Sequence, residues 1–440
     1  MLLLRQPTAT PGIAPPPTAA RRPALPKQRV AVVAVALILA TGCFLRLPPF
    51  LFESGHPVLH RLLPVHPAPK FQQVGFDEGL YLSYEKVIIA GGLGAYPQLA
   101  DGYLDVQRGL KTAILPPTRV FYLFSAYLWH EAFGSEALVS LKVVSSIFSM
   151  LLLGLATLFA WRLGGHLFGL CVAALMAFAP TQIHMSQHAL IDGFFAFWAT
   201  LALWLLWENL QRPNRRTWLS AYGIALAAMV LTKENAAFAY AGLLGLLAAN
   251  YWLRFGKVTP NLLLFTILGP LVGVLVLIGL CGGLATTIAV FRIFVSKVSL
   301  LPYAIETGDG PWYRYLIDLM TVSPLILLLA IGGVVRLRLT NRPALFLCVF
   351  LATSFLLMAN IPYGMNLRYA NLWDFPLRYL AAGCLLELTD PLGNWRRWWL
   401  GLAILLVCAT ELRQYRILFV QHDLYELIPR EMLKALKILK

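Results

Sequence analysis

The sequence predicts an all-α polytopic membrane protein, and three observations support that prediction. Of the 440 residues, 59% are hydrophobic and only 13% are charged, against about 25% charged residues in a typical soluble domain. Apolar runs of roughly the 20 residues that a membrane-spanning helix needs recur from residue 30 almost to the C-terminus. Most Lys and Arg lie singly or in small groups between these runs, as topology signals do, so the net charge of +15 does not indicate nucleic-acid binding.

Residues 1–29 are rich in Pro, Ala and Thr and end in a basic group, which predicts a disordered cytoplasmic tail. A cleaved signal peptide is the alternative. The six cysteines lie within or at the ends of apolar runs without CxxC spacing, so neither a disulfide framework nor a thiolate metal site is indicated.

One transmembrane domain, residues 30–415, accounts for the apolar runs, with about 11 spans. The candidate spans lie near residues 30–47, 137–161, 167–181, 192–210, 217–232, 236–252, 261–281, 316–335, 343–360, 372–389 and 398–415. If the N-terminus is cytoplasmic, every connection on that side carries positive charge, as the positive-inside rule requires. The opposite, extracytoplasmic side then receives the long loop 48–136 and the connections after residues 181, 232, 281 and 360.

Two stretches of the first loop are apolar enough to lie on the membrane surface. Residues 77–91 have apolar side chains at helical spacing, which predicts an interfacial helix with Asp77, Glu78 and Glu85 on its wetter side. Residues 116–134 are placed in the interface too, because another span there would reverse every later basic loop. The last segment, 416–440, is amphipathic and has no assigned role.

Five ionisable residues fall on the predicted extracytoplasmic side. Asp77 and Glu78 begin the interfacial helix and are candidate general bases, with helix N-capping as the alternative. Asp192 opens a span, where N-capping alone would account for it. Lys233 and Arg368 are cations at headgroup depth, suited to a lipid phosphate. A snorkelling lysine is the plain alternative for Lys233.

His184, His188 and Asp192 are spaced i, i+4, i+8, which on a continuous helix would align three metal ligands. Hydrogen-bonded interfacial histidines are the alternative interpretation. The cofactor therefore stays unknown, with a divalent metal ion as the candidate.

Several motifs resemble the polytopic GT-C glycosyltransferases, which include the protein O-mannosyltransferases and the lipid A aminoarabinose transferases. The similar stretches are, in order, FDEGLY (76–81), LPPTRVFYLFSAYLWHEAFG (115–134), HALIDGFFAFW (188–198) and LTKENAAFA (231–239). The resemblance covers residues 30–240 well, and GPWYRYL (310–316) and RYANLWDFP (368–376) extend it more weakly. The order of these motifs and their common position on the predicted extracytoplasmic side are the specific evidence for the resemblance.

The resemblance implies a GT-C bundle that uses a polyprenyl-phosphate-linked sugar with inversion. It implies that Asp77 is the catalytic or metal-associated carboxylate with Glu78 beside it, that Asp192 is the second active-site acid, and that Lys233 contacts the donor phosphate. Lys111 departs from the pattern, because the aminoarabinose transferases have an acidic residue before the Pro-Pro pair. That departure argues against their metal site and against a basic-protein or lipid A acceptor.

The resulting prediction is a membrane glycosyltransferase of a bacterial-type inner membrane, with its active site on the extracytoplasmic face. It would move mannose or another hexose or pentose to an acceptor hydroxyl on a protein, lipid or glycan, in contact with membrane lipids and without nucleic acid. The alternative is a lipid-linked sugar transporter or flippase, which also needs polar groups inside a helical bundle. A non-catalytic membrane scaffold would leave the ordered motifs unexplained.

Overall fold

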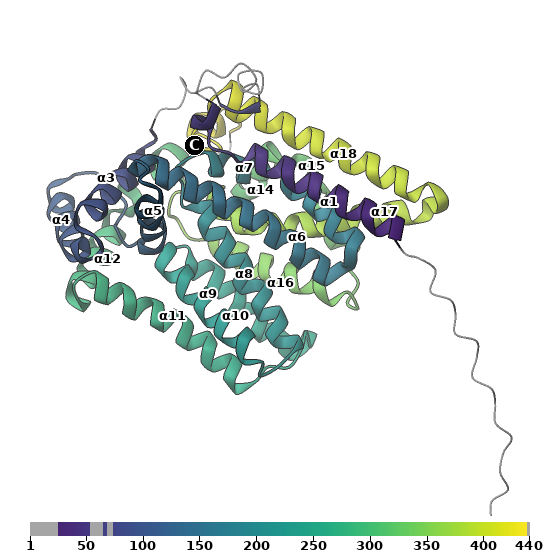
Figure 1. Ribbon diagram of the computed structural model, residues 1–440, viewed down its shortest axis with the longest axis horizontal. Coiled ribbons are helices and arrows are strands. Elements are labelled where there is room, and N and C mark those ends of the chain that lie inside the picture. The colour runs from purple at the N-terminus through teal and green to yellow at the C-terminus, as the bar shows by residue number, and fades with distance from the viewer. Residues whose placement is uncertain (1–24, 53–64, 68–73, 438–440) are drawn as a thin grey trace, which may run out of the picture.

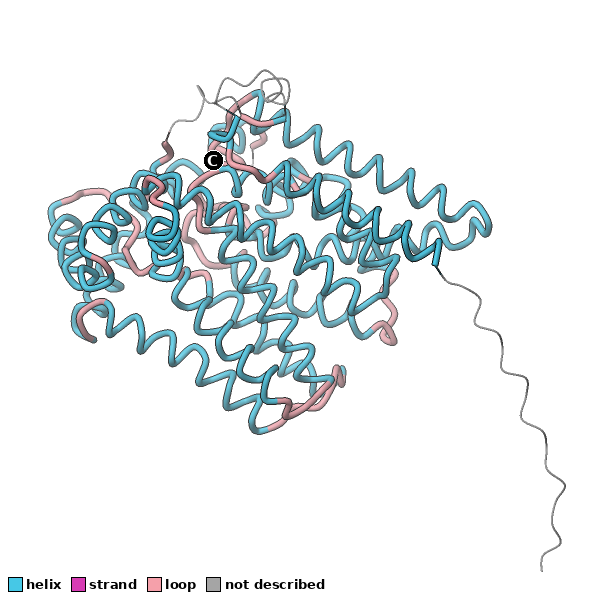
Figure 2. Tube along the Cα trace, in the orientation of Figure 1, coloured by secondary structure: helices cyan, strands magenta, loops and turns pink. Residues whose placement is uncertain are grey.

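The computed structural model describes residues 25–52, 65–67 and 74–437, and every regular element in these ranges is a helix (Figures 1 and 2). The predicted tail therefore lies mostly outside the described residues, and its end, from Leu25, belongs to the first helix. The helices of the N-terminal half are α1 (Leu25–Leu45), α3 (Phe76–Gly91), α4 (Tyr96–Gly109), α5 (Val120–Phe133), α6 (Ala137–Ala177), α7 (Pro180–Gln187), α8 (Asp192–Gln211) and α9 (Arg216–Thr232). Those of the C-terminal half are α10 (Ala236–Leu253), α11 (Pro260–Leu280), α12 (Leu284–Lys297), α13 (Pro302–Thr307), α14 (Arg314–Val322), α15 (Pro324–Val335), α16 (Arg342–Met358), α17 (Asp374–Thr389), α18 (Arg396–Tyr415) and α19 (Arg430–Ala435).

Helix α6 is a hairpin of two helices, as the two candidate spans 137–161 and 167–181 predicted. Its backbone leaves the helical conformation at Gly165, where φ is 83°. This left-handed region favours glycine because a Cβ atom would clash there. Arg46 donates both to Ser149 Oγ and to the carbonyl oxygens of Met176 and Ala177. The two arms of α6 therefore run side by side.

The candidate span 316–335 was wrong as a single continuous helix. Helix α14 ends at Val322, and α15 begins at Pro324 after the non-helical Ser323. Proline lacks the amide hydrogen that a continuous helix would use and clashes with the preceding turn, so it suits the first turn of a new helix. Hydropathy cannot register such a break, because both halves are apolar.

Five helical segments of the described chain are long and apolar enough to cross a membrane. They are Ala137–Ala177, Asp192–Gln211, Ala236–Leu253, Pro260–Leu280 and Leu284–Thr307. Shorter apolar helices occur at Val32–Leu45, Pro324–Val335 and Arg342–Met358. The count of about 11 spans stays a prediction, since helix length and composition do not locate the bilayer.

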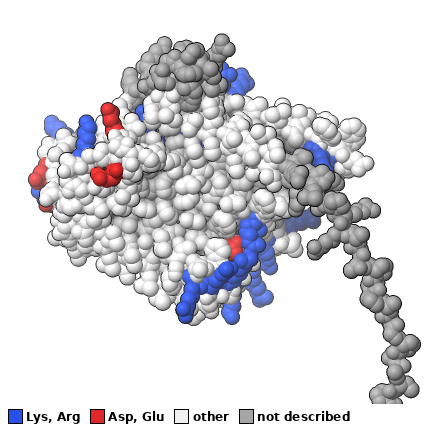
Figure 3. Space-filling view, in the orientation of Figure 1, with Lys and Arg blue, Asp and Glu red and all other residues white. Residues whose placement is uncertain are grey.

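The basic connections lie at the ends of the helices that are remote from the polar candidates. Helix α8 begins with Asp192 and ends just before Arg212, and α10 begins just after Lys233 and ends just before Arg254. In Figure 3, Lys and Arg side chains gather along the lower edge of the molecule, while most of the face shown carries neither charge. The bundle thus has one basic end and one end that holds Asp192 and Lys233.

The interfacial helix predicted at 77–91 is α3, but the prediction of its wetter side was wrong. Glu78 and Glu85 are 1% and 0% exposed, whereas Val87 is 40% exposed. Helix α3 packs its acidic side against α5 and α6. A helix lying on a membrane can bury a polar side in protein and turn an apolar side to lipid, so the usual amphipathic rule is reversed.

Glu85 has no hydrogen-bond partner for either carboxylate oxygen within the described chain. Burial raises its pKa to about 8. Its folded-state pKa is therefore above its unfolded value, so the stability contributed by the bound proton is lost as pH rises from about 4.5 toward 8. At neutral pH Glu85 is mostly a neutral acid.

We expect Glu85→Gln to raise the midpoint of thermal unfolding above pH 8 and to leave it nearly unchanged at pH 5, where the wild-type residue is also neutral. A rise of a few degrees at pH 9 is the scale expected for relieving a buried charge in a chain of this size. Thermal unfolding of the detergent-solubilised protein at both pH values tests this. The exposed Glu131→Gln on α5 is the matched control, and equal shifts in both variants would contradict the burial of a charge.

A network of buried ions at the start of α17 supports the segment between α16 and α17. Arg378 donates to Asp374 at 2.6 Å and to Glu411 of α18 at 2.7 Å. Asp374 also accepts from Gln182 of α7 at 2.8 Å. Because α7, α17 and α18 are joined here, the chain just before Asp374 is held against the bundle, and that stretch carries Arg368.

Candidate active site

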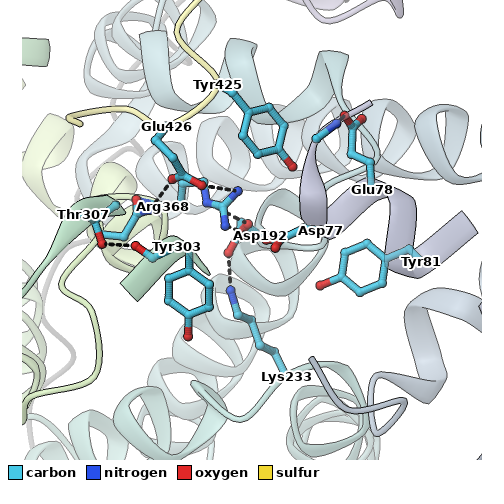
Figure 4. A network of polar contacts seen from close by, with 12 residues as sticks. Asp77, Glu78, Tyr81, Asp192, Lys233, Tyr303, Thr307, Arg368, Tyr425 and Glu426 are labelled. Carbon is cyan, nitrogen blue, oxygen red and sulfur yellow. Dashed lines mark hydrogen bonds and ion pairs between the residues drawn. The ribbon is translucent and has the colours of Figure 1, made fainter. Parts of the chain in front are cut away.

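Five charged side chains from distant parts of the sequence meet at one end of the bundle (Figure 4). Each lies near a helix end or in a connection, where the backbone can turn a side chain inward. They are Asp77 near the start of α3, Asp192 at the start of α8, Lys233 after α9, Arg368 between α16 and α17, and Glu426 in the C-terminal segment. We call this group the charged cluster.

Arg368 is the hub of the charged cluster and is 1% exposed. Its Nη2 donates to Asp77 Oδ2 at 2.7 Å, and its Nε lies 3.8 Å from Asp192 Oδ2. Its Nη1 lies 3.6 Å from Glu426 Oε1. Burial opposes the charge of Arg368, but Glu426, Asp77 and Asp192 together raise its pKa further above the usual value. A planar guanidinium can hold several carboxylates in fixed directions, which a lysine could not do.

Lys233 forms an ion pair with Asp192, and its ammonium lies 4.2 Å from the centre of the Tyr369 ring. It is 4% exposed, so the plain snorkelling alternative does not describe it. An ammonium has three donors. The contact with Asp192 is the single hydrogen bond that the Lys233 ammonium makes within the described chain, which leaves donors for a further anion.

Glu78 binds backbone amides, whereas its neighbour Asp77 binds the Arg368 guanidinium. Its Oε1 accepts from the Ala189 amide at 2.6 Å, and its Oε2 accepts from the Gly75 amide at 3.0 Å. Burial raises the pKa of Glu78, but His188 and these two amides outweigh it and lower the pKa to about 2. Glu78 thus acts as an ionised link between α3 and the connection before α8, and the helix-capping alternative describes it.

His184, His188 and Asp192 do not converge on one point. Helix α7 ends at Gln187 and α8 starts at Asp192, so the continuous helix that would align them is interrupted. His184 Nε2 lies 2.9 Å from the Tyr425 carbonyl oxygen, His188 faces Glu78, and Asp192 faces Lys233. Across the described ranges, no three His, Cys, Asp or Glu side chains gather as metal ligands do. The residues present do not fit a metal site, and no step below uses one.

A second ion pair, between the buried Arg119 and the half-buried Glu234, borders the charged cluster. Arg119, directly after the Pro116–Pro117 pair and Thr118, lies 3.2 Å from Glu234, and Thr118 donates to the same carboxylate at 2.9 Å. Arg119 also donates to the Tyr81 hydroxyl of α3. Arg119 therefore offsets the charge of Glu234, and Asp192 is the acidic partner of Lys233 among the described residues.

An apolar groove of about 890 Å³ leads away from Lys233. Its walls come from α9, α10, α11 and α12 and include Met229, Ala237, Val274 and Phe291. Its polar lining residues are Thr118, Lys233 and Glu234 near the junction of α9 and α10, and Thr287, Arg292 and Ser296 on α12. The 282–315 connection supplies α12, which is also packed against α4 of the first loop. A long apolar chain with an anionic end matches this lining.

A polar pocket of about 460 Å³ lies on the other side of the charged cluster. Asp77 is part of its lining, and so are residues of α13 and of the C-terminal segment. The full lining consists of Val74, Gly75, Phe76, Asp77, His188, Pro302, Tyr303, Glu306, His422, Asp423, Tyr425 and Glu426. Asp77 lines the polar pocket and Lys233 lines the apolar groove, and Asp192 and Arg368 join these two residues.

The structure brings together four of the five residues predicted as catalytic or donor-binding, Asp77, Asp192, Lys233 and Arg368, and places Glu78 beside them. Glu426, Tyr425 and Arg119 are site residues that sequence reasoning missed. Arg119 stands in the recognised Pro-Pro motif, so the sequence held a signal for it. Glu426 lies in a short polar stretch with no local pattern that indicates a return to the first loop.

Comparisons with known proteins agree with this geometry. Residues 121–295, less than half of the chain, match the family model described as dolichyl-phosphate-mannose-protein mannosyltransferase. That segment contains Asp192 and Lys233, while Asp77, Arg368 and Glu426 lie outside it. None of the curated proteins matches the chain.

Similar solved structures include ArnT from Cupriavidus metallidurans in the apo state, at 17% identity and a TM-score of 0.51, over 89% of this chain and 74% of that chain. The Archaeoglobus fulgidus oligosaccharyltransferase in the apo form is similar at 12% identity and a TM-score of 0.59, over 89% of this chain and 56% of that one. AglB from the same organism, in complex with an inhibitory peptide and a dolichol-phosphate, is similar at 13% identity and a TM-score of 0.57, over 91% and 56%. The chain thus spans little more than half the length of the archaeal enzyme.

These similarities show that the helical bundle has the GT-C fold. With the family match, the chain is a polytopic membrane glycosyltransferase of the GT-C class. The predictions of an all-α polytopic fold and of a GT-C enzyme are confirmed.

Proposed function

We propose that this glycosyltransferase moves a sugar from a polyprenyl-phosphate donor to an acceptor hydroxyl, with inversion at the anomeric carbon. The observation that carries the proposal is that the charged cluster joins the apolar groove, which Lys233 lines, to the polar pocket, which Asp77 lines. A lipid-linked donor and a polar acceptor need two such compartments that meet at the reacting atoms.

The groove supports the lipid-linked donor. Its walls are mainly aliphatic and aromatic, and its volume is in the range of ligand-binding pockets. A polyprenyl chain in the groove would place its phosphate at Lys233, whose remaining donors are free to bind an oxyanion. The structure of AglB in complex with a dolichol-phosphate is consistent with this type of donor in the same fold.

In the reaction, Asp77 accepts the proton of the acceptor hydroxyl as that oxygen forms a bond to the anomeric carbon. The bond between this carbon and the phosphate oxygen breaks, and its electron pair leaves with the polyprenyl phosphate. Lys233 stabilises the charge that develops on the departing phosphate, and Arg368 holds Asp77 and Asp192 in position. Glu78 orients the start of α3 through its two amide hydrogen bonds.

The orientation follows from charge. Since the basic connections lie at the opposite helix ends from Asp192 and Lys233, the positive-inside rule supports an extracytoplasmic site and a cytoplasmic N-terminus in an inner membrane. The transporter alternative would place the decisive charges near the bilayer midplane. The charged cluster instead lies at helix ends.

The direct test is transfer of radiolabelled sugar in proteoliposomes from a panel of polyprenyl-phosphate hexoses and pentoses, with a membrane extract as the acceptor source. Release of polyprenyl phosphate together with labelled acceptor product supports the proposal. Movement of an intact donor between leaflets without release of polyprenyl phosphate would support the transporter.

We expect Ala237→Trp to raise the KM for the lipid-linked donor at least tenfold, because the indole would fill part of the groove beside Lys233. Ala248→Trp is the matched control, because Ala248 lies farther along the same helix, is also exposed and does not line the groove. Donor titrations of both variants and the wild type measure the effect. Equal KM values for all three would show that the polyprenyl chain does not use the groove.

A further inference from the structure

We propose that the polar pocket selects a water-soluble acceptor that carries a positive charge next to the hydroxyl that receives the sugar. This inference rests on the proposed glycosyl transfer and names the chemical class of its acceptor. It is argued from the charges that line the pocket, from two buried groups that face it, and from the way the C-terminal segment builds it.

The described lining of the polar pocket is acidic in a strongly basic chain. It contains the four carboxylates of Asp77, Glu306, Asp423 and Glu426 and has no Lys or Arg. Arg368 lies behind this lining, where it offsets Asp77 and Glu426 and also faces Asp192. Arg430 and Arg314 donate to the carbonyl oxygens of Ile305 and Thr307 in α13, and both cations are outside the lining. Glu306 and Asp423 have no ion pair within the described residues, so their charges are available to a ligand.

Two side chains that are more than nine-tenths buried present unpartnered atoms to this pocket. Asp77 is 5% exposed, and its Oδ2 is bound to Arg368 while its Oδ1 has no partner in the described chain. His188 is 7% exposed, and its Nδ1 faces Glu78 Oε2 at 3.5 Å while its Nε2 has none among the described residues. Neither atom is among the enclosed polar atoms of the described chain, and both residues line the pocket, so both atoms are open to a polar ligand there.

The C-terminal segment forms one wall of the polar pocket and is packed against the rest of the bundle. His184 of α7 contacts the Tyr425 carbonyl oxygen at 2.9 Å, and the Glu426 carboxylate accepts from Asn366. The Tyr425 ring lies so close to Gly75 that a side chain there would collide with it. These contacts join the C-terminal segment to α3, α7 and the Arg368 connection, so His422, Asp423 and Glu426 line one pocket with the start of α3. Figure 4 shows Tyr425 and Glu426 of this segment beside Asp77 and Arg368.

The lining argues against an anionic acceptor and against a lipid acceptor. A phosphate or carboxylate beside Asp77 would meet four carboxylates at short range, and like-charge contacts of this kind are costly. The pocket also lacks the long apolar walls that the groove provides for a lipid chain. Lys111, which argued against a basic acceptor from the sequence, lines neither cavity. A hydroxyl with a neighbouring ammonium or guanidinium fits the charges, because the cation neutralises Asp423 and Glu306 while the hydroxyl reaches Asp77.

The test uses the full chain in proteoliposomes with a lipid-linked donor found active in the transfer assay. Three serine peptides serve as acceptors, identical except that the residues flanking the serine are Lys, Gln or Glu. We expect kcat/KM to fall from the Lys to the Gln to the Glu peptide, by at least tenfold overall at low salt and mainly through KM. The differences should shrink as salt screens the charges.

The double variant Asp423→Asn with Glu306→Gln should lower the preference for Lys over Glu peptides at least threefold. Asn suits position 423, where φ is 48° and few other residues are tolerated. Asp101→Asn on α4, exposed and outside both cavities, is the control and should keep the full preference. Equal use of the three peptides by the wild type, or an unchanged preference in the double variant, would overturn the proposal.

A binding measurement separates this proposal from the glycosyl transfer on which it rests. Fluorescently labelled peptides should bind the full chain in nanodiscs in the same order, Lys above Gln above Glu, whether or not a donor is present. Release of polyprenyl phosphate without binding of any peptide would refute the cationic acceptor and leave the transferase intact. Selective binding of the Lys peptide without sugar transfer from any donor would refute the transferase function instead.

Discussion

Asp77→Asn is expected to lower kcat for sugar transfer by about 10²- to 10⁴-fold, the usual contribution of a general base. Asparagine has nearly the same shape and can still accept from Arg368 through its amide oxygen, so the geometry around the guanidinium is retained. The amide cannot take up the proton of the acceptor hydroxyl. The loss should therefore appear in kcat with lesser changes in the KM values for donor and acceptor.

The neighbouring carboxylate provides an internal comparison. Glu78→Gln removes the charge from a group whose two oxygens are occupied by amides and His188, so we expect it to lower thermal stability more than Asp77→Asn does and kcat much less. Transfer rates and unfolding midpoints of both variants are measured beside the wild type. A kcat for Asp77→Asn within about twofold of wild type would transfer the base role to another carboxylate, with Glu426 the nearest candidate on the pocket.

Lys233→Met should lower kcat by about 10²- to 10³-fold, the typical cost of removing one donor to a developing oxyanion. Methionine keeps the apolar stem of the side chain and removes the charge. Because Lys233 acts on the departing phosphate, its loss should slow turnover more than it weakens donor binding. Lys233→Arg should recover part of the rate, since it restores a cation of different shape.

If Lys233 had only a structural role, its variants would give a different pattern of stability and turnover. Without Lys233, the buried Asp192 carboxylate keeps only the longer contact of 3.8 Å to Arg368. A buried charge that loses its close partner lowers the stability of the fold. The double variant Lys233→Met with Asp192→Asn removes both charges, so it should recover stability without recovering turnover. Recovery of turnover in the double variant would show that the pair only supports the fold.

The wild-type pH profile follows from the same lysine. Burial lowers the pKa of Lys233 to about 8, although Asp192 acts in the opposite direction. The cationic form is the active form in the proposed step, so turnover should fall as pH rises through about 8. The profile of Lys233→Arg should lack this decrease, because arginine stays charged.

Local patterns in the sequence identified most of the candidate site. Asp77, Asp192 and Lys233 stand at the boundaries of apolar runs, where polar residues are easily noticed and where helix ends gather at one face of a bundle. The same patterns gave the wrong side for Glu85, because an interfacial helix was assumed to turn its charges to water. Because α3 packs against α5 and α6, the Glu85 side chain is buried in protein.

By itself, the sequence determined that the protein is an all-α membrane protein with charged residues concentrated at span boundaries, because hydropathy and helix length are local properties. Only the tertiary structure decided which charges meet. Arg368 binds Asp77 across 291 positions of sequence, and Glu426 returns from the C-terminal segment to the same guanidinium. The structure also distinguishes the open carboxylate of Asp77 from the occupied one of Glu78. The physical reason is that an unpaired buried charge destabilises a fold, so buried charges pair in the folded bundle. Their partners come from distant parts of the chain, and no local sequence pattern encodes such pairs.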